Sequence, residues 1–289
     1  MRLNREKMRF AFAAVLLLAL TICAVSCAGS KCGPVRKKGY VSLSTAATEE
    51  LFLLGVGDRI VGDSIYCNYP PEARRLRRVG NLIRPNIEEI ARLSPEIVFA
   101  TEITPPEVLR KMESLGLRVV VLPDEKSVAD IERNLLALGK IVGREERARA
   151  VWRKAKREIE KIRPGGGPRP KVFIEVGAKP LITTGRGTYL DDVVRLAGGE
   201  NIAAEAHTGY TRFSREEVLR RNPDVVLMVT MGDVSRDEER EWKRFTSLRA
   251  TRNNGLCFLD ADTSCRPTPD AFVKTIRATV RCLNAAGGK

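Results

Sequence analysis

The chain has 289 residues, a formal charge of +14 at pH 7 and one histidine. This length accommodates two α/β lobes, each with its own hydrophobic core. Acidic and basic residues are interleaved along the helical stretches, which indicates solvated helix faces and no nucleic-acid partner. The histidine has no nucleophile motif beside it, and no glycine-rich loop ends in the Lys-Ser/Thr pair of a nucleotide-binding loop, so neither enzyme class is indicated.

The N-terminus has the features of an export signal. A basic start precedes an apolar run at 10–22, which is too short for an ordinary membrane-spanning helix. The sequence Ala24-Val25-Ser26-Cys27 resembles a lipobox and predicts that Cys27 is lipidated; processing at Cys23 and simple cleavage after Ala28 are the alternatives. We expect an exported protein, periplasmic or at the cell surface, anchored to the membrane surface by lipid.

Hydrophobic periodicity and turn residues predict alternating strands and helices up to residue 122. Gly55 closes the first predicted helix, and the prolines of Tyr69-Pro70-Pro71 forbid a strand in the loop that contains them. The expected elements are strands at 40–44, 59–61 and 117–122, helices at 45–55 and 105–115, and a helix–strand unit at 86–99.

A long helical stretch at 127–162, with a predicted break at Gly143, separates this part from the rest. The Pro/Gly-rich run 163–170 ends it. Beyond it we expect strands at 171–176 and 256–259, helices at 189–197, 236–248 and 269–283, and a second helix–strand unit at 214–227. The predicted organisation is a signal peptide at 1–27, a tether at 28–38, an N-terminal lobe at 39–125, a linking helix at 126–163 and a C-terminal lobe at 164–289.

The two helix–strand units are copies of one pattern, 128 positions apart, with five identical residues of fourteen. Asn86 or Ser214 caps a short helix, a proline stops it, and an apolar strand follows. A unit used twice at this separation predicts two similar α/β lobes rather than a solenoid. Two such lobes create a cleft, and a cleft suggests a ligand.

These segments resemble the periplasmic binding proteins of ABC importers for cobalamin, ferric siderophores and haem. The resemblance covers almost the whole mature chain and is carried by Val41–Ser44, Ala47–Glu49, Gly55–Gly62, Tyr66–Pro70, Val79-Gly80, both repeat units, Leu190–Asp192, Ala197–Ile202 and Arg266–Pro269. It implies an α/β fold of two lobes with central, mostly parallel sheets, joined by one long helix that limits closure, with the ligand cleft between them.

By the same resemblance the chain is a monomeric, non-enzymatic binding protein that delivers a ligand to a permease with its ATPase. The ligand is a cobalt corrinoid such as cobalamin, or else a ferric siderophore or haem, and there is no permanent cofactor. Matching the motifs assigns permease docking to Glu88 and Glu216, the first glutamate of each copy. Glu89 and Glu217 are the nearest alternatives, and a simple helix-dipole role is another.

The resemblance also implies cleft residues. It assigns ligand binding to Tyr66, Cys67, Tyr210, Asp262 and Arg266. Aromatic rings suit a flat macrocycle, and the charged pair suits amide edges or other polar groups.

The cysteines and the histidine leave several interpretations open. His207 and Cys265 are candidate metal ligands. Cys67 and Cys265 form an inter-lobe disulfide, a pair of soft metal ligands or two unrelated buried thiols, and Cys282 can pair with Cys257 if strand and helix pack closely. A metal-cluster protein or a free metal-ion-binding protein of the same two-lobed architecture is the competing function.

Overall fold

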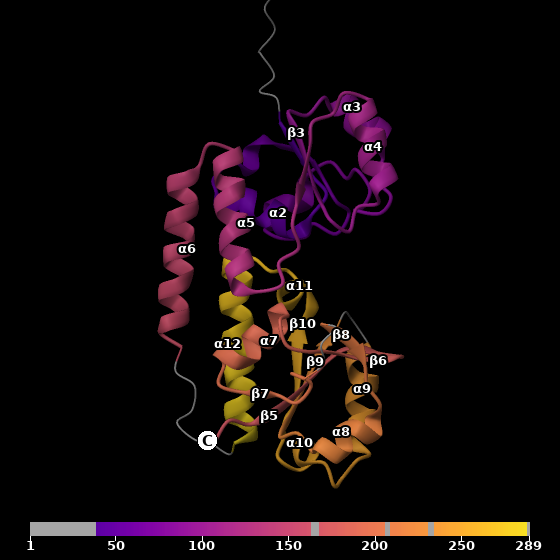
Figure 1. Ribbon diagram of the computed structural model, residues 1–289, viewed down its shortest axis with the longest axis vertical. Coiled ribbons are helices and arrows are strands. Elements are labelled where there is room, and N and C mark those ends of the chain that lie inside the picture. The colour runs from indigo at the N-terminus through magenta and orange to yellow at the C-terminus, as the bar shows by residue number, and fades with distance from the viewer. Residues whose placement is uncertain (1–38, 163–167, 206–208, 231–233, 288–289) are drawn as a thin grey trace, which may run out of the picture. The chain divides into compact units, whose positions relative to one another are not determined.

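The computed structural model describes residues 39–162, 168–205, 209–230 and 234–287, which belong to one compact unit (Figure 1). Two β-sheets, each covered by helices, form the two predicted α/β lobes. None of the helices in these ranges is both long and apolar enough to cross a membrane.

The first lobe is built on a parallel sheet with the strand order β2-β1-β3-β4. Val41 and Val98 pack with Ile90 and Met112 on one face, while Phe99 joins the core on the other, so the central strands are apolar on both sides. The elements are β1 (Tyr40–Ser42), α2 (Thr45–Leu53), β2 (Ile60–Asp63), α3 (Ile87–Leu93), β3 (Ile97–Thr101), α4 (Pro106–Ser114) and β4 (Val119–Leu122), with short 3-10 turns at Gly57–Arg59 and Pro71–Arg75.

The second lobe has a mixed sheet with the order β10-β9-β5-β6-β8, and β7 pairs with β5. Its antiparallel strands, β6 and β8, were not predicted because they are short and rich in threonine and so show no apolar run. The elements are β5 (Lys171–Ala178), β6 (Leu181–Thr184), α7 (Tyr189–Leu196), β7 (Glu200–Asn201), β8 (Tyr210–Arg212), α8 (Arg215–Arg221), β9 (Val225–Thr230), α9 (Val234–Lys243), α10 (Arg249–Arg252), β10 (Leu256–Asp260), α11 (Ala261–Ser264) and α12 (Pro269–Ala286).

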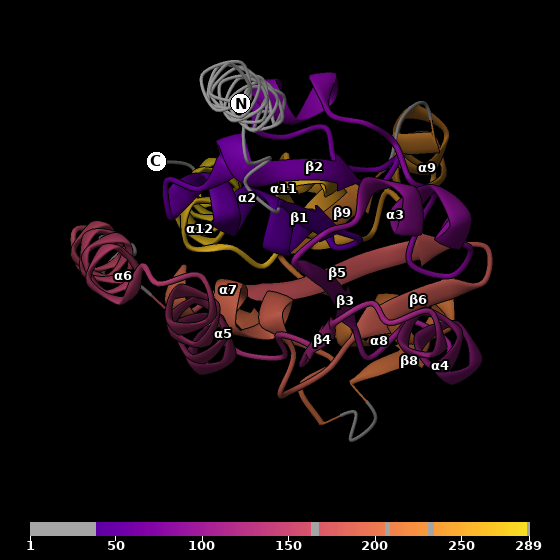
Figure 2. The ribbon, with the colours of Figure 1, turned by 90° about the horizontal axis from the view of Figure 1, so that it is seen from above.

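The linking segment is a helical hairpin, α5 (Val128–Ile141) and α6 (Glu145–Glu160), rather than one unbroken helix. The predicted break is confirmed at Gly143, whose φ of +67° favours glycine. Gly139 allows the close approach of the two helices, because a Cβ there would lie 2.6 Å from that of Ala148. Both views place α5, α6 and α12 on one side of the sheets, and α3, α4, α8 and α9 on the other (Figures 1 and 2).

The repeated units have the same local structure. Asn86 and Ser214 cap α3 and α8, their side chains accepting from the backbone N–H groups of Glu89 and Glu217 at 3.0 and 3.1 Å. Each helix has seven residues and ends on a left-handed residue with a φ of 47°. The sequence repeat therefore corresponds to a structural repeat, one copy in each lobe.

The four cysteines in the described residues are free thiols. Cys67 is buried beside the Thr48 hydroxyl, 3.1 Å away, whereas Cys265 is exposed. No disulfide joins them, which excludes the inter-lobe disulfide among the three alternatives. Cys257 and Cys282 do pack together: a hydrogen bond between them lowers the pKa of Cys282 and raises that of Cys257. Cys23, Cys27 and Cys32 lie outside the described residues.

Candidate functional site

Side chains from both lobes line a cleft of about 510 Å³. This volume falls in the range of roughly 300–1,000 Å³ found for small-molecule sites. The cleft lies at the ends of strands β1 and β3, where ligands of open α/β sheets commonly bind. Its lining residues are Ser44, Thr45, Ala46, Leu82, Thr101, Ile103, Asp124, Glu125, Lys126, Thr188, Tyr189, Leu190, Tyr210, Ser264, Cys265 and Pro267.

Large apolar side chains are exposed around this cleft. Ile103 and Tyr210 line it from opposite lobes, with 57% and 60% of their surfaces exposed. Ile83, next to the lining residue Leu82, is also exposed, as is Ile65, whose N–H donates to Gly80 in the adjacent loop at 2.8 Å. Because soluble monomers rarely expose grouped apolar side chains without a function, the cleft mouth fits a ligand with a broad apolar face.

The charged groups in the cleft are predominantly acidic. Asp124, Glu125 and Lys126 line it, and no described lining residue is an arginine. Burial raises the pKa of Glu125, whose carboxylate accepts from Asn134 Nδ2 at 2.8 Å. Hydroxyls and carboxylates suit a ligand that donates hydrogen bonds from amides or hydroxyls, and they disfavour anionic groups.

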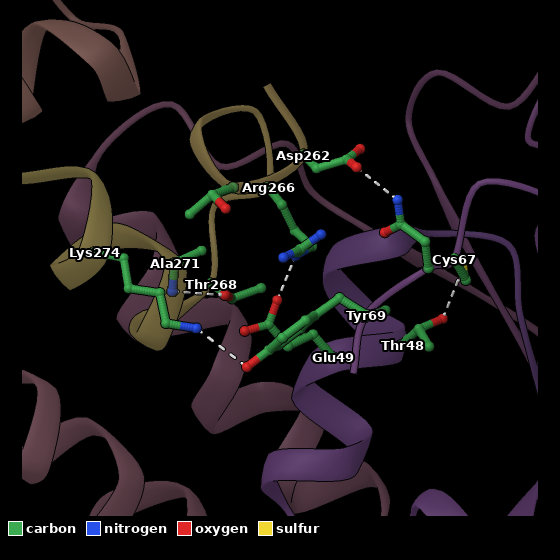
Figure 3. Close-up of polar contacts among 12 residues, drawn as sticks. Thr48, Glu49, Cys67, Tyr69, Asp262, Arg266, Thr268, Ala271 and Lys274 are labelled. Carbon is green, nitrogen blue, oxygen red and sulfur yellow. Dashed lines mark hydrogen bonds and ion pairs between the residues drawn. The ribbon is translucent and has the colours of Figure 1, made fainter. Parts of the chain in front are cut away.

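A polar seam joins the lobes beside the cleft (Figure 3). The Glu49 carboxylate on α2 forms an ion pair with Arg266, and both side chains are buried. The Tyr69 ring lies against Arg266, with the guanidinium carbon 4.8 Å from the ring centroid, and its hydroxyl accepts from Lys274 Nζ at 3.1 Å. The seam continues at Asn68, whose amide donates to Asp262 Oδ2 at 2.7 Å. These contacts connect residues about 200 positions apart.

The five predicted ligand residues are divided between the cleft and its surroundings. Of these five residues, only Tyr210 lines the cleft. Cys265, one of the two candidate metal ligands, lines it as well. Arg266 and Asp262 belong to the seam, and Cys67 is buried in the first lobe. Tyr66 is 64% exposed, follows the exposed Ile65 in the chain and does not line the cleft.

Several lining residues were not predicted individually. Leu82 and Ile103 come from loops after β2 and β3, and Tyr189 begins α7. The sequence repeat could have predicted Leu82 as a lining residue. Leu82 lies four positions before the cap of α3, and Tyr210 lies four positions before the cap of α8. Among the described residues no group of three His, Cys, Asp or Glu is placed to hold a metal ion, and His207 is outside them.

The two glutamates of each repeat have different surroundings. Glu88 and Glu216 are exposed, and neither has an ion pair within the described residues. The second glutamates are occupied: Glu89 pairs with Arg77 and Arg92, and Glu217 with Arg220 and Arg221. The two arginines lower the pKa of Glu217 to about 2. Each lobe thus presents one available carboxylate on the first turn of a matched helix.

Residues 41–263 match the family described as "Periplasmic binding protein". The vitamin B12-binding protein of Vibrio cholerae serotype O1 is 30% identical over 239 residues, covering 82% of this chain and 86% of that protein. The crystal structure of the periplasmic vitamin B12-binding protein of Vibrio cholerae superposes with a TM-score of 0.69 at 28% identity, covering 87% and 98% of the chains. The structure of a periplasmic heme-binding protein from Roseiflexus sp. RS-1 superposes with a TM-score of 0.76 at 26% identity. The match covers 86% of this chain and 99% of that chain.

The fold and its cleft define a two-lobed substrate-binding protein. The chain belongs to the periplasmic binding protein family, since the family match covers most of its residues. It is a substrate-binding protein of the ABC transporter type and not an enzyme. An uncharacterized ABC transporter substrate-binding lipoprotein of Bacillus subtilis is also similar, at 26% identity over 241 residues, covering 80% of this chain and 76% of that protein.

Proposed function

We propose that this protein captures a cobalt corrinoid outside the cytoplasmic membrane and delivers it to a permease driven by an ATPase. The carrying observation is the cleft, with an exposed apolar mouth and an acidic, hydroxyl-rich lining that contains no described arginine. A corrinoid offers a broad apolar face and neutral amide edges. Haem and many ferric siderophores carry carboxylates or other anionic groups, for which the described lining offers one cation, Lys126, beside the two carboxylates of Asp124 and Glu125. The similarity to vitamin B12-binding proteins supports the same choice.

Absorbance-monitored titration of the domain with cyanocobalamin, haemin and a ferric siderophore tests the ligand. We expect one-to-one binding of cyanocobalamin with the tightest affinity, because its many neutral amides can donate to the hydroxyls and carboxylates of the lining, whereas haemin would bring two carboxylates close to Asp124 and Glu125. Tighter binding of haemin or of the ferric chelate would contradict the choice of ligand and leave the class of protein intact. No binding of any of the three would contradict the proposed function.

Tyr210 is the aromatic residue of the proposed site that lines the cleft, and Tyr66 is a second exposed ring, on a loop of the first lobe. We expect Tyr210→Ala to weaken cyanocobalamin binding about tenfold, because ring stacking on a macrocycle is worth roughly 1–2 kcal/mol. Tyr210→Phe, the matched control, keeps the ring and should stay close to the original affinity. Calorimetric titration of the three proteins measures the difference, and equal affinities for Tyr210→Ala and the original protein would move the stacking surface to Tyr66 or elsewhere.

Glu88 and Glu216 are the proposed docking residues for the permease, because they are the available carboxylates of two matched helices. We expect Glu88→Ala with Glu216→Ala to leave ligand affinity unchanged and to abolish most ligand uptake by cells that express the permease. Charge pairs across an interface lose strength with salt, so complex formation should also weaken as salt rises.

The matched control for docking is Glu113→Ala with Glu200→Ala, which removes one exposed glutamate from each lobe. This variant should transport normally. Equal uptake by the docking variant and the control would show that the repeated glutamates only stabilise the helix start.

The proposal also includes a lipid anchor at Cys27. A diacyl anchor would keep the protein near its permease, and mass spectrometry of the mature N-terminus tests whether Cys27 is lipidated.

A further inference from the structure

The correspondence between the two lobes extends along the sequence beyond the fourteen-residue pattern, toward the cleft, although residues 210–212 form strand β8 and residues 82–84 form a loop. Four positions before the cap of α3 stands Leu82, and four before the cap of α8 stands Tyr210; both line the cleft. Two positions before each cap stands an arginine, Arg84 in the first lobe and Arg212 in the second, and both are exposed. In each lobe the chain therefore runs from a cleft residue through an exposed arginine to an exposed glutamate.

Both arginines lie on backbone that is fixed by hydrogen bonds. The Arg84 N–H donates to Asn81 Oδ1 at 2.7 Å, and Arg212 pairs with Ile182 between β8 and β6. Neither side chain has an ion pair within the described residues, whereas Arg92 and Arg220 behind them are occupied by glutamates. Unpaired guanidinium groups on ordered backbone are suited to bidentate bonds with carboxylates of a partner.

We propose that Arg84 and Arg212 belong to the permease-docking surface, where each pairs with an acidic side chain of a two-fold-symmetric permease. This inference rests on the proposed docking through Glu88 and Glu216. Each lobe would then present one cation and one anion in the same chain order, and the permease would supply the opposite signs twice. Alternating charges fix the register of an interface and exclude wrong partners more strongly than charges of one sign.

The position of the arginines also separates this role from ligand binding. In β8, Tyr210 and Arg212 are two residues apart and share one face of the strand. Tyr210 lines the cleft, whereas Arg212 is exposed, does not line the cleft, and lies along the chain between Tyr210 and the first turn of α8. The same order holds for Leu82 and Arg84 before α3. A permease bound at the two helix starts would lie next to both arginines.

The test compares three double variants of the ligand-loaded protein: Arg84→Gln with Arg212→Gln, Glu88→Gln with Glu216→Gln, and the control Arg153→Gln with Arg281→Gln. The control removes two exposed arginines from α6 and α12, on the opposite side of the sheets (Figures 1 and 2). Affinity is measured against the permease–ATPase complex of the source organism in nanodiscs, at low and high salt. Cyanocobalamin and haemin titrations provide the ligand affinity.

We expect the Arg84/Arg212 variant to bind the permease at least about tenfold more weakly at low salt, with a shallower salt dependence and unchanged ligand affinity. The control should match the original protein. If the glutamate variant loses affinity and the arginine variant does not, the inference fails while the proposed docking stands. If neither the arginine variant nor the glutamate variant loses affinity for the permease, both the inference and the proposed docking through Glu88 and Glu216 fail. A loss of ligand affinity in the arginine variant would assign these residues to the ligand and overturn the inference.

Discussion

Replacing Arg266 by methionine should lower the free energy of unfolding by about 3–5 kcal/mol, because it leaves the buried Glu49 carboxylate without its partner. The side chains of Arg266 and Glu49 are 7% and 2% exposed, so solvent can replace little of the lost interaction. Arg266 also packs against the Tyr69 ring. Urea unfolding followed by circular dichroism measures the change.

The matched control is Arg277→Met, which removes an arginine on α12 whose ion pair with Glu158 is exposed to solvent. It should change stability little, because solvent screens exposed pairs. The double variant Glu49→Gln with Arg266→Met removes the stranded charge and should recover part of the loss. If Arg266→Met were as stable as Arg277→Met, the seam would contribute nothing to holding the lobes together.

The seam also shows why part of the site was beyond sequence reasoning. Arg266 was assigned to the ligand because its motif matched the family. Its partner Glu49 is 217 positions away, and no local pattern indicates that α2 and the α11–α12 connection meet. Cys67 was placed in the cleft because it follows Tyr66 in the same loop, and its thiol lies against the Thr48 hydroxyl inside the first lobe. Contacts between distant segments depend on how the lobes pack, which periodicity does not encode.

What the sequence did predict rests on local physical signals. The caps Asn86 and Ser214 and the prolines after them define two short helices, and both are confirmed. Gly143 marks the break in the linking segment because its backbone requires a positive φ. Tyr210, in contrast, was assigned through the family resemblance, and extending the repeat four residues toward the N-terminus would have paired it with Leu82.

Titration of Glu175 should make the second lobe less stable as pH rises from about 4.5 to 7. This carboxyl group is 3% exposed, and burial raises its pKa from 4.5 to about 7. The folded state therefore holds a proton that the unfolded chain has already released in this window, so folding loses free energy as pH rises. The loss approaches about 3 kcal/mol above pH 7, at roughly 1.4 kcal/mol for each pH unit of the window.

Glu175→Gln should remove this pH dependence and stabilise the protein at pH 8. In the original protein Trp242 Nε1 donates to Glu175 Oε2 at 2.6 Å. The amide oxygen of the glutamine can still accept this hydrogen bond, and its NH₂ group can donate toward Glu238. Glu238 keeps its ion pair with Arg215. The control Glu200→Gln changes an exposed glutamate and should follow the original pH profile. Urea unfolding at pH 5 and pH 8 measures the three proteins. Parallel profiles for Glu175→Gln and the original would show that Glu175 is ionised throughout this range, with Arg215 rather than a bound proton balancing its charge.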